Sequence, residues 1–452
     1  MQIVSKTLSI VFKSGLDDSE RKMIIRNTIH SFIIQGVAVS VGFVTNFFFT
    51  RWAGASAYGQ FIHVFNWISV LGIVALGGRD DLALALIPKY EGSDERRVLR
   101  IVKKTNLDIA IRSGIVVFIF MLVISYLNIK TLSGNITNFA IASFFVYGSS
   151  FVILNQSILQ SMHFVRISQV TEKIFRPVLM LAILLVWRSF SRQLGSSSLT
   201  YIASLSSLAS CMFLFYLINV TLHQKSKTDD IKPVNHVQNP NTLHFFLISL
   251  LYLLTTKISM LTLPYFMSQK DVGVFNIAYR FAEFLIYPSF LMHYVLPQLF
   301  AKSDVRSSHK ISLYRESAFL MTALAIPILL INIFFGRQLL GIFGKAFVDG
   351  YQALILLSIA QLLFSIFGPS NTILMMQGKE KYSVLALAVY VLILLVTSVV
   401  AIPLAGLTGA AISLLVSCLI YNVILSAFAY RFFGTISPFF KPAMRTSTAE
   451  SQ

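Results

Sequence analysis

The run Val391-Leu-Ile-Leu-Leu-Val396 lies inside a predominantly apolar segment that covers residues 382–402. Its side chains do not alternate between apolar and polar, as they would in a strand of a membrane β-barrel. A helix crosses the hydrocarbon core of a bilayer with about 20 such residues, and it satisfies its backbone hydrogen bonds internally. This stretch therefore predicts a membrane-spanning α-helix.

The composition extends this prediction to the whole chain. Of 452 residues, 56% are hydrophobic and 12% are charged, and the mean hydropathy is +0.73. Soluble domains have about 45–50% apolar and about 25% charged residues, so a disordered chain and a soluble enzyme are both disfavoured. We expect an all-α polytopic membrane protein with about 12 transmembrane helices. The expected spans are 28–50, 59–77, 109–128, 137–160, 168–188, 199–221, 243–266, 272–297, 317–336, 350–372, 382–402 and 405–429.

The distribution of basic residues predicts the topology. With twelve spans, 28 of the 37 Lys and Arg residues fall on the side of the two termini and 7 fall on the opposite side. This asymmetry follows the positive-inside rule and predicts that both termini are cytoplasmic. It also accounts for the net charge of +18, so no nucleic-acid partner is expected. Cys211 and Cys418 lie inside apolar runs and indicate neither a disulfide nor a metal site.

A polar break in the middle of the chain divides the spans six and six, which is the parallel type of repeat found in some transporters. Ala57-Tyr-Gly-Gln-Phe61 opens span two, and Asp271-Val-Gly-Val-Phe275 opens span eight at the same place in the other half. We therefore expect two six-helix lobes. The predicted parts are an N-terminal cytoplasmic tail (1–27), an N-lobe (28–221), a cytoplasmic loop (222–242), a C-lobe (243–429) and a C-terminal cytoplasmic tail (430–452).

The loops argue against an enzyme. The expected outer loops are short, and Asp271 and Asp349 are the acidic residues on that side. A membrane glycosyltransferase, polymerase or ligase needs an outer loop or domain to hold its catalytic groups. The chain also lacks the phosphate-binding loop of an ATPase and the His-Glu-x-x-His and Cys-x-x-Cys patterns of metal sites.

Charged residues deep within predicted spans seven and eight are costly, at about 2.5–3.5 kcal/mol for each on insertion scales. Lys257 in span seven and Arg280 in span eight lie roughly 14 Å and roughly 12 Å below the outer surface. Glu283 follows Arg280 by three residues on the same helical face. These residues predict a cationic substrate site with Glu283 as a coupling or ion-pair residue. The alternative is a structural pair of Arg280 with Glu283 and a Lys257 that extends to the interface.

Polar residues on the same and neighbouring spans extend this prediction. Asn276 lies on the stripe of span eight that carries Arg280, His63 and Asn66 share a face of span two, and Asn46 lies near the outer end of span one. We expect these four helices to line a polar cavity that binds substrate. Ordinary hydrogen bonds between helices are the alternative.

Two helix ends carry further signals. Arg79-Asp80-Asp81 follows two glycines at the cytoplasmic end of span two, where it is either a gate or a solvated loop. Gly368-Pro-Ser-Asn371 predicts a break near the inner end of span ten.

Several segments resemble one family of membrane proteins. They are Phe49–Phe61, Ala75–Arg79, Gly341–Phe347, Gly368–Lys379 and Ile402–Ile412. Their glycine and aromatic spacings resemble those of the Wzx-type oligosaccharidyl-lipid flippases, the polysaccharide transporter family of the multidrug/oligosaccharidyl-lipid/polysaccharide (MOP) exporter superfamily. The resemblance covers about residues 24–430.

The resemblance implies two lobes around a central cavity lined by spans one, two, seven and eight. It implies a flippase in the bacterial inner membrane that carries an undecaprenyl-pyrophosphate-linked oligosaccharide, such as a repeat unit of O-antigen in lipopolysaccharide, by alternating access. No cofactor is expected; H⁺ or Na⁺ is the candidate coupling ion, and a polysaccharide polymerase and a chain-length regulator are candidate partners. Lys257 and Arg280 suit the cationic cavity of such proteins.

Two alternatives stay open. A multidrug/cation antiporter of the same superfamily favours a buried carboxylate in the first lobe, and spans one to six have none at mid-span. A polymerase or ligase of lipid-linked glycans is the alternative from another class.

Overall fold

Helices make up nearly all of the chain that this computed structural model describes. The described residues are 18–90, 95–127, 136–162, 164–191, 193–225, 242–289, 308–376 and 378–433, and within them there is no strand. The helices are α2 (Asp18–Leu76), α3 (Arg79–Tyr90), α4 (Glu95–Leu127), α6 (Ile136–Ser161), α7 (Val165–Val170), η1 (Thr171–Phe175), α8 (Arg176–Phe190), α9 (Ser196–Lys225), α10 (Thr242–Phe266), α11 (Gln269–Glu283), η2 (Phe284–Ile286), α13 (Ser308–Phe343), η3 (Lys345–Gly350), α14 (Tyr351–Phe367), α15 (Ser370–Met376) and α16 (Glu380–Phe433).

Eight of these helices are long and apolar enough to cross a membrane. Two of the eight, α2 and α16, contain a break and so account for two crossings each. The break in α2 is at Gly54 (φ 79°, ψ 168°) and the break in α16 is at Gly406 (φ 57°, ψ −129°). Positive φ angles of this kind are accessible to glycine at little cost. Each glycine therefore joins two of the spans predicted from the sequence.

The remaining two crossings are interrupted helices. Span five consists of α7, the π-helical turn η1 and α8. Pro177, in the first turn of α8, has no N–H for the regular hydrogen-bond pattern. Span eight begins with α11 and passes through the 3₁₀ turn η2; its predicted end, 290–297, lies outside the described residues. The prediction of a polytopic all-α membrane protein with twelve spans is confirmed.

Some helix ends differ from the predicted ones. α2 begins at Asp18, so part of the predicted N-terminal tail is helical. α13 continues to Phe343, beyond the predicted end of span nine at residue 336. α14 ends at Phe367 and Gly368 separates it from α15, as Gly368-Pro369 predicted. Within the predicted central loop, residues 226–241 lie outside the described part of the chain, and so do the last residues of the C-terminal tail, 434–452.

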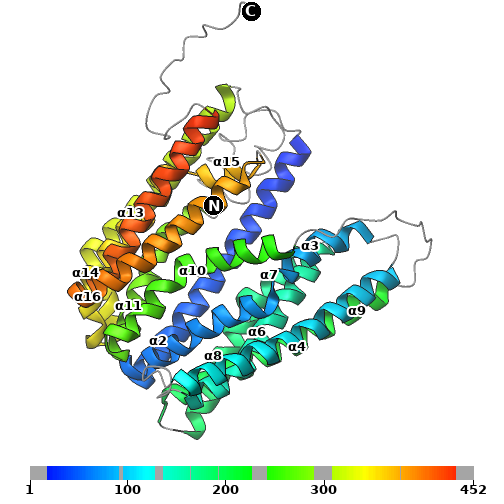
Figure 1. Cartoon of the computed structure of the whole chain (residues 1–452), viewed down its shortest axis with the longest axis horizontal. Coiled ribbons are helices and arrows are strands. Elements are labelled where there is room, and N and C mark those ends of the chain that lie inside the picture. The colour runs from blue at the N-terminus through cyan, green and yellow to red at the C-terminus, as the bar shows by residue number, and fades with distance from the viewer. Residues whose placement is uncertain are drawn as a thin grey trace, which may run out of the picture. The chain divides into compact units, whose positions relative to one another are not determined.

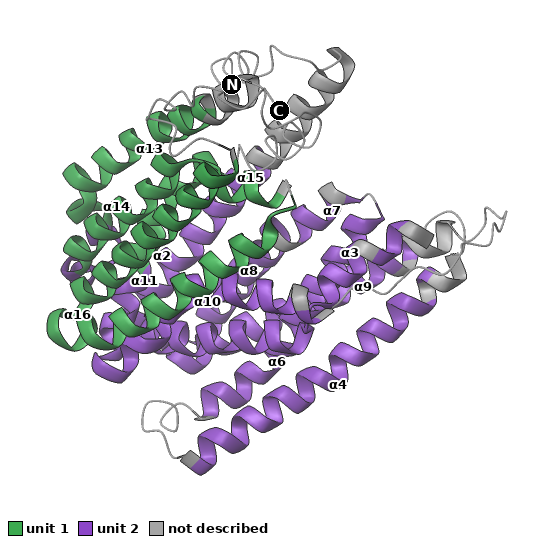
Figure 2. Ribbon diagram, turned by 45° about the horizontal axis from the view of Figure 1, so that its top comes forward, with its two compact units in different colours: residues 1–29, 277–339, 350–452 green, residues 30–276, 340–349 purple. Residues whose placement is uncertain are grey.

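The contacts divide the chain into two compact units, coloured in Figure 2. Unit 1 comprises Met1–Ile29, Ile277–Leu339 and Gly350–Gln452, and unit 2 comprises His30–Asn276 and Leu340–Asp349. The predicted six-helix lobes, 28–221 and 243–429, are a division by sequence and stay a prediction.

In unit 2, α6 is the central helix. It packs against α3, α4 and α9, and Figure 1 shows α4, α6 and α9 running side by side. Gly148 of α6 lies so close to α9 that an added Cβ would come within 2.6 Å of Ser207 Oγ. Small residues of this kind allow helices to approach closely in a membrane, where apolar burial alone does not drive association.

In unit 1, α14 packs against α16. Polar contacts inside the unit support this packing: Asn332 Nδ2 of α13 donates to Ser358 Oγ of α14 at 3.0 Å, and Cys418 Sγ of α16 donates to the carbonyl of Ala360 at 3.1 Å. Cys211 and Cys418 are free thiols.

Candidate functional site

A buried polar cluster in unit 2 contains three of the predicted site residues. The Tyr58 hydroxyl lies 2.8 Å from Asn46 Oδ1 and 2.8 Å from Asn276 Oδ1. The side-chain amides of Asn276 and Asn66 donate to Met260 Sδ at 3.3 Å and 3.5 Å. We call these five residues the Tyr58 cluster. It joins both halves of α2 to α10 and to the first turns of α11.

The Gly54 break brings the first two members together. The break turns the chain between Asn46 and Tyr58, so two residues of one long helix come to face each other. α10 and α11 are joined by a short turn in which Ser268 N and Oγ both donate to Asp271 Oδ2, at 3.1 Å and 2.6 Å. This side-chain cap fixes the start of α11 and so the position of Asn276.

The two segments of the internal sequence echo touch each other beside this cluster. A Cβ on Gly59 would lie 1.7 Å from the carbonyl oxygen of Gln269, and a Cβ on Gly273 would lie 2.6 Å from the carbonyl oxygen of Ala55. Both neighbours are backbone atoms, so a larger side chain requires the helices to separate. The glycines that mark the repeat therefore mark a direct helix contact between α2 and α11.

His63 is fully buried, but it faces other neighbours than Asn66. Its Nε2 accepts a hydrogen bond from Trp67 Nε1 at 3.2 Å, and its ring makes an edge contact with Phe139 of α6. The Nδ1 atom has no hydrogen-bond partner. The shared face of His63 and Asn66 expected from the sequence is therefore divided between α6 on one side and α10 on the other.

The predicted cationic residues lie on both units. Lys257 of α10 is partly exposed and lies one turn before Met260 in unit 2. Arg280 at the end of α11 belongs to unit 1, with its side chain 43% exposed. Arg280 Nη1 lies 3.6 Å from Glu283 Oε2, which is the ion pair that the sequence predicted as one alternative.

The end of span two that is predicted to be cytoplasmic carries a charged network in unit 2. Arg79 is paired with Asp108 of α4, and Ser249 Oγ of α10 donates to Asp81 Oδ2 at 3.2 Å. Burial and the neighbouring charge of Asp81 raise the pKa of Asp80 above its ordinary value. Burial also raises the pKa of Asp81. Arg79 and Asp81 begin helix α3 and contact α4 and α10, which favours the gate over the solvated loop as the interpretation of this segment.

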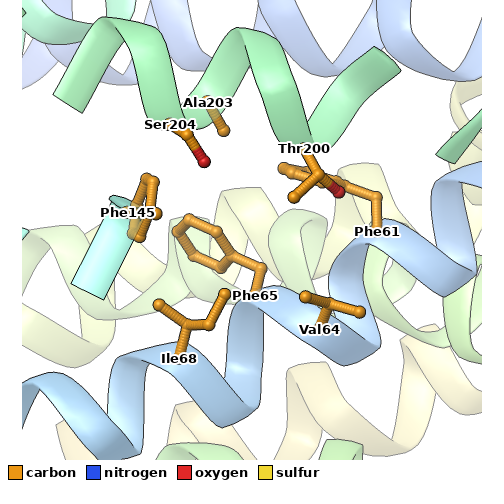
Figure 3. A pocket seen from close by; sticks show the side chains of 8 residues that line it. All are labelled: Phe61, Val64, Phe65, Ile68, Phe145, Thr200, Ala203 and Ser204. Atoms are coloured by element: carbon orange, nitrogen blue, oxygen red, sulfur yellow. The ribbon is translucent and has the colours of Figure 1, made fainter. Parts of the chain in front are cut away.

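A small pocket in unit 2 lies between α2, α6 and α9 (Figure 3). Its lining is Phe61, Val64, Phe65, Ile68, Phe145, Thr200, Ala203 and Ser204. A cavity of about 10 Å³ holds at most one water molecule. The hydroxyls of Thr200 and Ser204 already donate to backbone carbonyls. This pocket is a gap in the packing and not a site for a glycan.

Two members of the Tyr58 cluster were missed by reasoning from the sequence. Tyr58 lies in the segment Ala57–Phe61, but a tyrosine at the end of a span is ordinarily an interfacial anchor. Met260 gives no polar signal at all. Among the described residues, no group of His, Cys, Asp and Glu could hold a metal ion.

Residues 24–296 match the family described as Polysaccharide biosynthesis protein. The chain belongs to this family. The resemblance to polysaccharide transporters predicted from the sequence is therefore confirmed. No curated protein matches this family member in sequence.

Solved structures with the same fold belong to the MOP superfamily. One is described as "Lipid II flippase MurJ, inward closed conformation", with 14% identity, a TM-score of 0.68, and coverage of 89% of this chain and 87% of that one. A multidrug resistance MATE family transporter of the MOP superfamily matches in its inward-facing conformation (15% identity, TM-score 0.63) and in its outward-facing conformation (16% identity, TM-score 0.63). Each of these two matches covers 95% of this chain and 98% of the other. This family member therefore has the same fold as these solved structures.

Proposed function

We propose that the protein is a flippase that moves a lipid-linked oligosaccharide from the cytoplasmic to the outer leaflet of a bacterial inner membrane, with both termini in the cytoplasm. The observation that carries the proposal is the presence of Lys257 and Arg280 inside membrane spans of a polysaccharide biosynthesis protein. Cations within membrane spans are costly and mark substrate pathways. The substrate is an undecaprenyl-pyrophosphate-linked repeat unit, for example of O-antigen.

The pyrophosphate explains the need for cations. Arg280 can bind two phosphate oxygens at once through its planar guanidinium group, and Lys257 adds a mobile point charge. Glu283, 3.6 Å from Arg280, orients the guanidinium between transport cycles or exchanges H⁺ or Na⁺ as the path reorients. The polar head crosses through a central cavity while the lipid tail stays in the bilayer.

In alternating access, the neutral residues of the site also contact the substrate. Asn46, Asn66 and Asn276 bond within the Tyr58 cluster in this conformation. When the path opens at that end, their amides become available to sugar hydroxyls, and His63 lies one turn from Asn66. Arg79, Asp80 and Asp81 gate the opposite end.

The antiporter reading is supported by the likeness to MATE transporters. We rank it second because spans one to six contain no carboxylate at mid-span and the predicted cavity is cationic. A cell that gains resistance to cationic drugs and exports them against a cation gradient would reverse this order.

Gene deletion with complementation tests the proposal. The deletion strain should accumulate one lipid-linked oligosaccharide on the inner leaflet and lose the matching surface glycan. Arg280→Ala and Lys257→Ala should each lower export about tenfold, since a hydrogen bond to a charged group contributes about 1.5–3 kcal/mol. Arg280→Lys should keep part of the export. Lys381→Ala is the matched control, because Lys381 is exposed on the surface of α16.

Both alanine variants must be present in the membrane at native levels. If they export as much glycan as Lys381→Ala, the assignment of Lys257 and Arg280 to the substrate path is wrong. Collapse of the proton gradient and of the Na⁺ gradient in separate experiments identifies the coupling ion. A polymerase and a chain-length regulator on the outer face would then use the flipped repeat unit.

A further inference from the structure

A short segment of the chain crosses from one compact unit to the other. α13 and α14 belong to unit 1, but Leu340–Asp349, which connects them, packs with unit 2 (Figure 2). This segment includes the last turn of α13 and most of η3. We call it the strap. From its place between spans nine and ten, it lies on the side predicted to face outward.

Two aromatic side chains anchor the strap. Phe343 and Phe347 are 1% and 2% exposed. The Phe343 ring makes edge contacts with Phe43 and Phe47 of α2, with ring centroids 5.1 Å and 6.1 Å away. The Phe347 ring makes an edge contact with Tyr58 at 6.5 Å. The strap therefore covers the Tyr58 cluster directly.

Polar contacts hold the strap to two different helices. Arg51 Nε of α2 donates to the carbonyl of Ile342 at 2.9 Å. Lys270 Nζ of α11 lies 3.0 Å from Asp349 Oδ2, and both side chains are about half exposed. The strap thus binds α2 through a residue near the start of the strap and α11 through the last residue of the strap.

The local backbone orients the rings of Phe343 and Phe347 toward α2. Gly344 lies between the two phenylalanines with φ of 140°, in the region that favours glycine. Ile342 and Lys345, next to this glycine, are exposed. The strap therefore has one buried aromatic face and one exposed face.

These contacts restrict movement at this end of the molecule. Gly59 and Gly273 hold α2 and α11 in backbone contact. An opening at this end requires that contact to part. Once α2 and α11 separate, a single short strap cannot keep Arg51 and Lys270 bound together.

We propose that the strap is a releasable closure of the outward end of the transport path. It is seated on α2 and α11 while the path is open to the other face, and it leaves α11, where an exposed ion pair holds it, when the path opens outward. This inference rests on the proposed alternating access, but it does not depend on which substrate is carried.

Chemical cross-linking tests whether release is needed. In a chain with Cys211→Ser and Cys418→Ser, the variants Lys270→Cys and Asp349→Cys are combined and joined by a bifunctional thiol reagent that dithiothreitol cleaves. Cross-linking should lower glycan export at least tenfold, and cleavage should restore it. The control joins Asn138→Cys to Ser197→Cys, which replaces a 2.6 Å contact between the ends of α6 and α9. That cross-link should leave export unchanged.

A distance measurement tests the strap without any substrate. Spin labels on Lys345→Cys and Tyr265→Cys lie on exposed positions of unit 2, one on the strap and one near the end of α10, which a short turn joins to α11. We expect two distance populations in the native background and one population after the cross-link. Asp349→Asn, an exposed change that weakens the Lys270 contact without altering the core, should enlarge the second population. Phe343→Ala should enlarge it further.

The outcomes separate the two proposals. A single distance in every variant, or full export by the cross-linked chain, overturns the strap as a releasable closure. If the native chain exports no lipid-linked glycan but the two distances behave as expected, the proposed function fails and the closure stands.

Discussion

Tyr58→Phe removes one oxygen atom from the centre of the Tyr58 cluster and changes little else. Tyr58 is fully buried, and its hydroxyl is 2.8 Å from both Asn46 Oδ1 and Asn276 Oδ1. The phenol has one proton, so the two amide oxygens share it. Phenylalanine fits the same space and leaves both oxygens without this donor.

The free-energy cost of this substitution follows from the burial of the two amide oxygens. A buried polar group that loses its partner costs about 1–3 kcal/mol, because no water replaces the lost hydrogen bond. We expect Tyr58→Phe to lower the free energy of unfolding of the closed conformation by this amount. If the cluster is disrupted when the path opens outward, the same free energy shifts the conformational equilibrium by about 5- to 150-fold toward the open form.

Two measurements on purified protein check this. Thermal unfolding reports the stability of the closed form, and the spin-label pair at Lys345 and Tyr265 reports the population of the seated strap. Tyr126→Phe is the matched control, since Tyr126 is 89% exposed and its hydroxyl is not buried in a cluster. Tyr58→Phe should lower the unfolding temperature and enlarge the second distance population, whereas the control should do neither.

A double-mutant cycle gives the sharper result. Tyr58→Phe and Asn276→Ala remove the same hydrogen bond, so their effects on stability should be clearly less than additive. If Tyr58→Phe is indistinguishable from Tyr126→Phe in both measurements, the Tyr58 hydroxyl does not hold this end closed and the reasoning is wrong.

Two further changes have definite expected results. Gly59→Ala places a Cβ 1.7 Å from the Gln269 carbonyl oxygen, so it should prevent the α2–α11 contact and strongly reduce export and stability, whereas Gly36→Ala, with nothing within 4 Å, should be tolerated. A native-like Gly59→Ala would refute the close contact. The pKa of Asp80 is raised above 3.8 by burial and by Asp81, so the free energy of unfolding should fall as the pH rises from that ordinary value through the raised one. Asp80→Asn should make this decline smaller in a pH series of unfolding temperatures, with the part due to Asp81 remaining; an unchanged pH profile would contradict the assignment.

Hydropathy and charge were sufficient for the fold class. Runs such as Val391–Val396 predicted the spans because a bilayer accepts only segments that satisfy their own backbone and expose apolar side chains. The break at Gly368-Pro369 was predictable for the same kind of local reason, because proline cannot continue a helix. The echo of Gly59 in Gly273 pointed to two glycines that contact each other in the structure.

The partners of the polar residues were not predictable in this way. His63 and Asn66 lie three residues apart on one helix, yet one contacts Trp67 and the other Met260. Helical spacing predicts on which face of a helix a side chain lies. Which residue that side chain contacts depends on how the helices pack together. Met260 shows the limit most clearly, because nothing in an apolar run distinguishes a methionine that accepts two hydrogen bonds from one that faces lipid.

Membrane proteins make this division between local and tertiary information especially strong. Lipid and protein interior are equally apolar, so hydropathy cannot tell which side of a span is buried. The number and approximate ends of the crossings came from the amino-acid order. The seating of the strap on α2 and α11, the shared proton of Tyr58 and the meeting of Gly59 with Gly273 came from three-dimensional packing, because each requires atoms far apart in the chain to arrive within a few ångströms of one another.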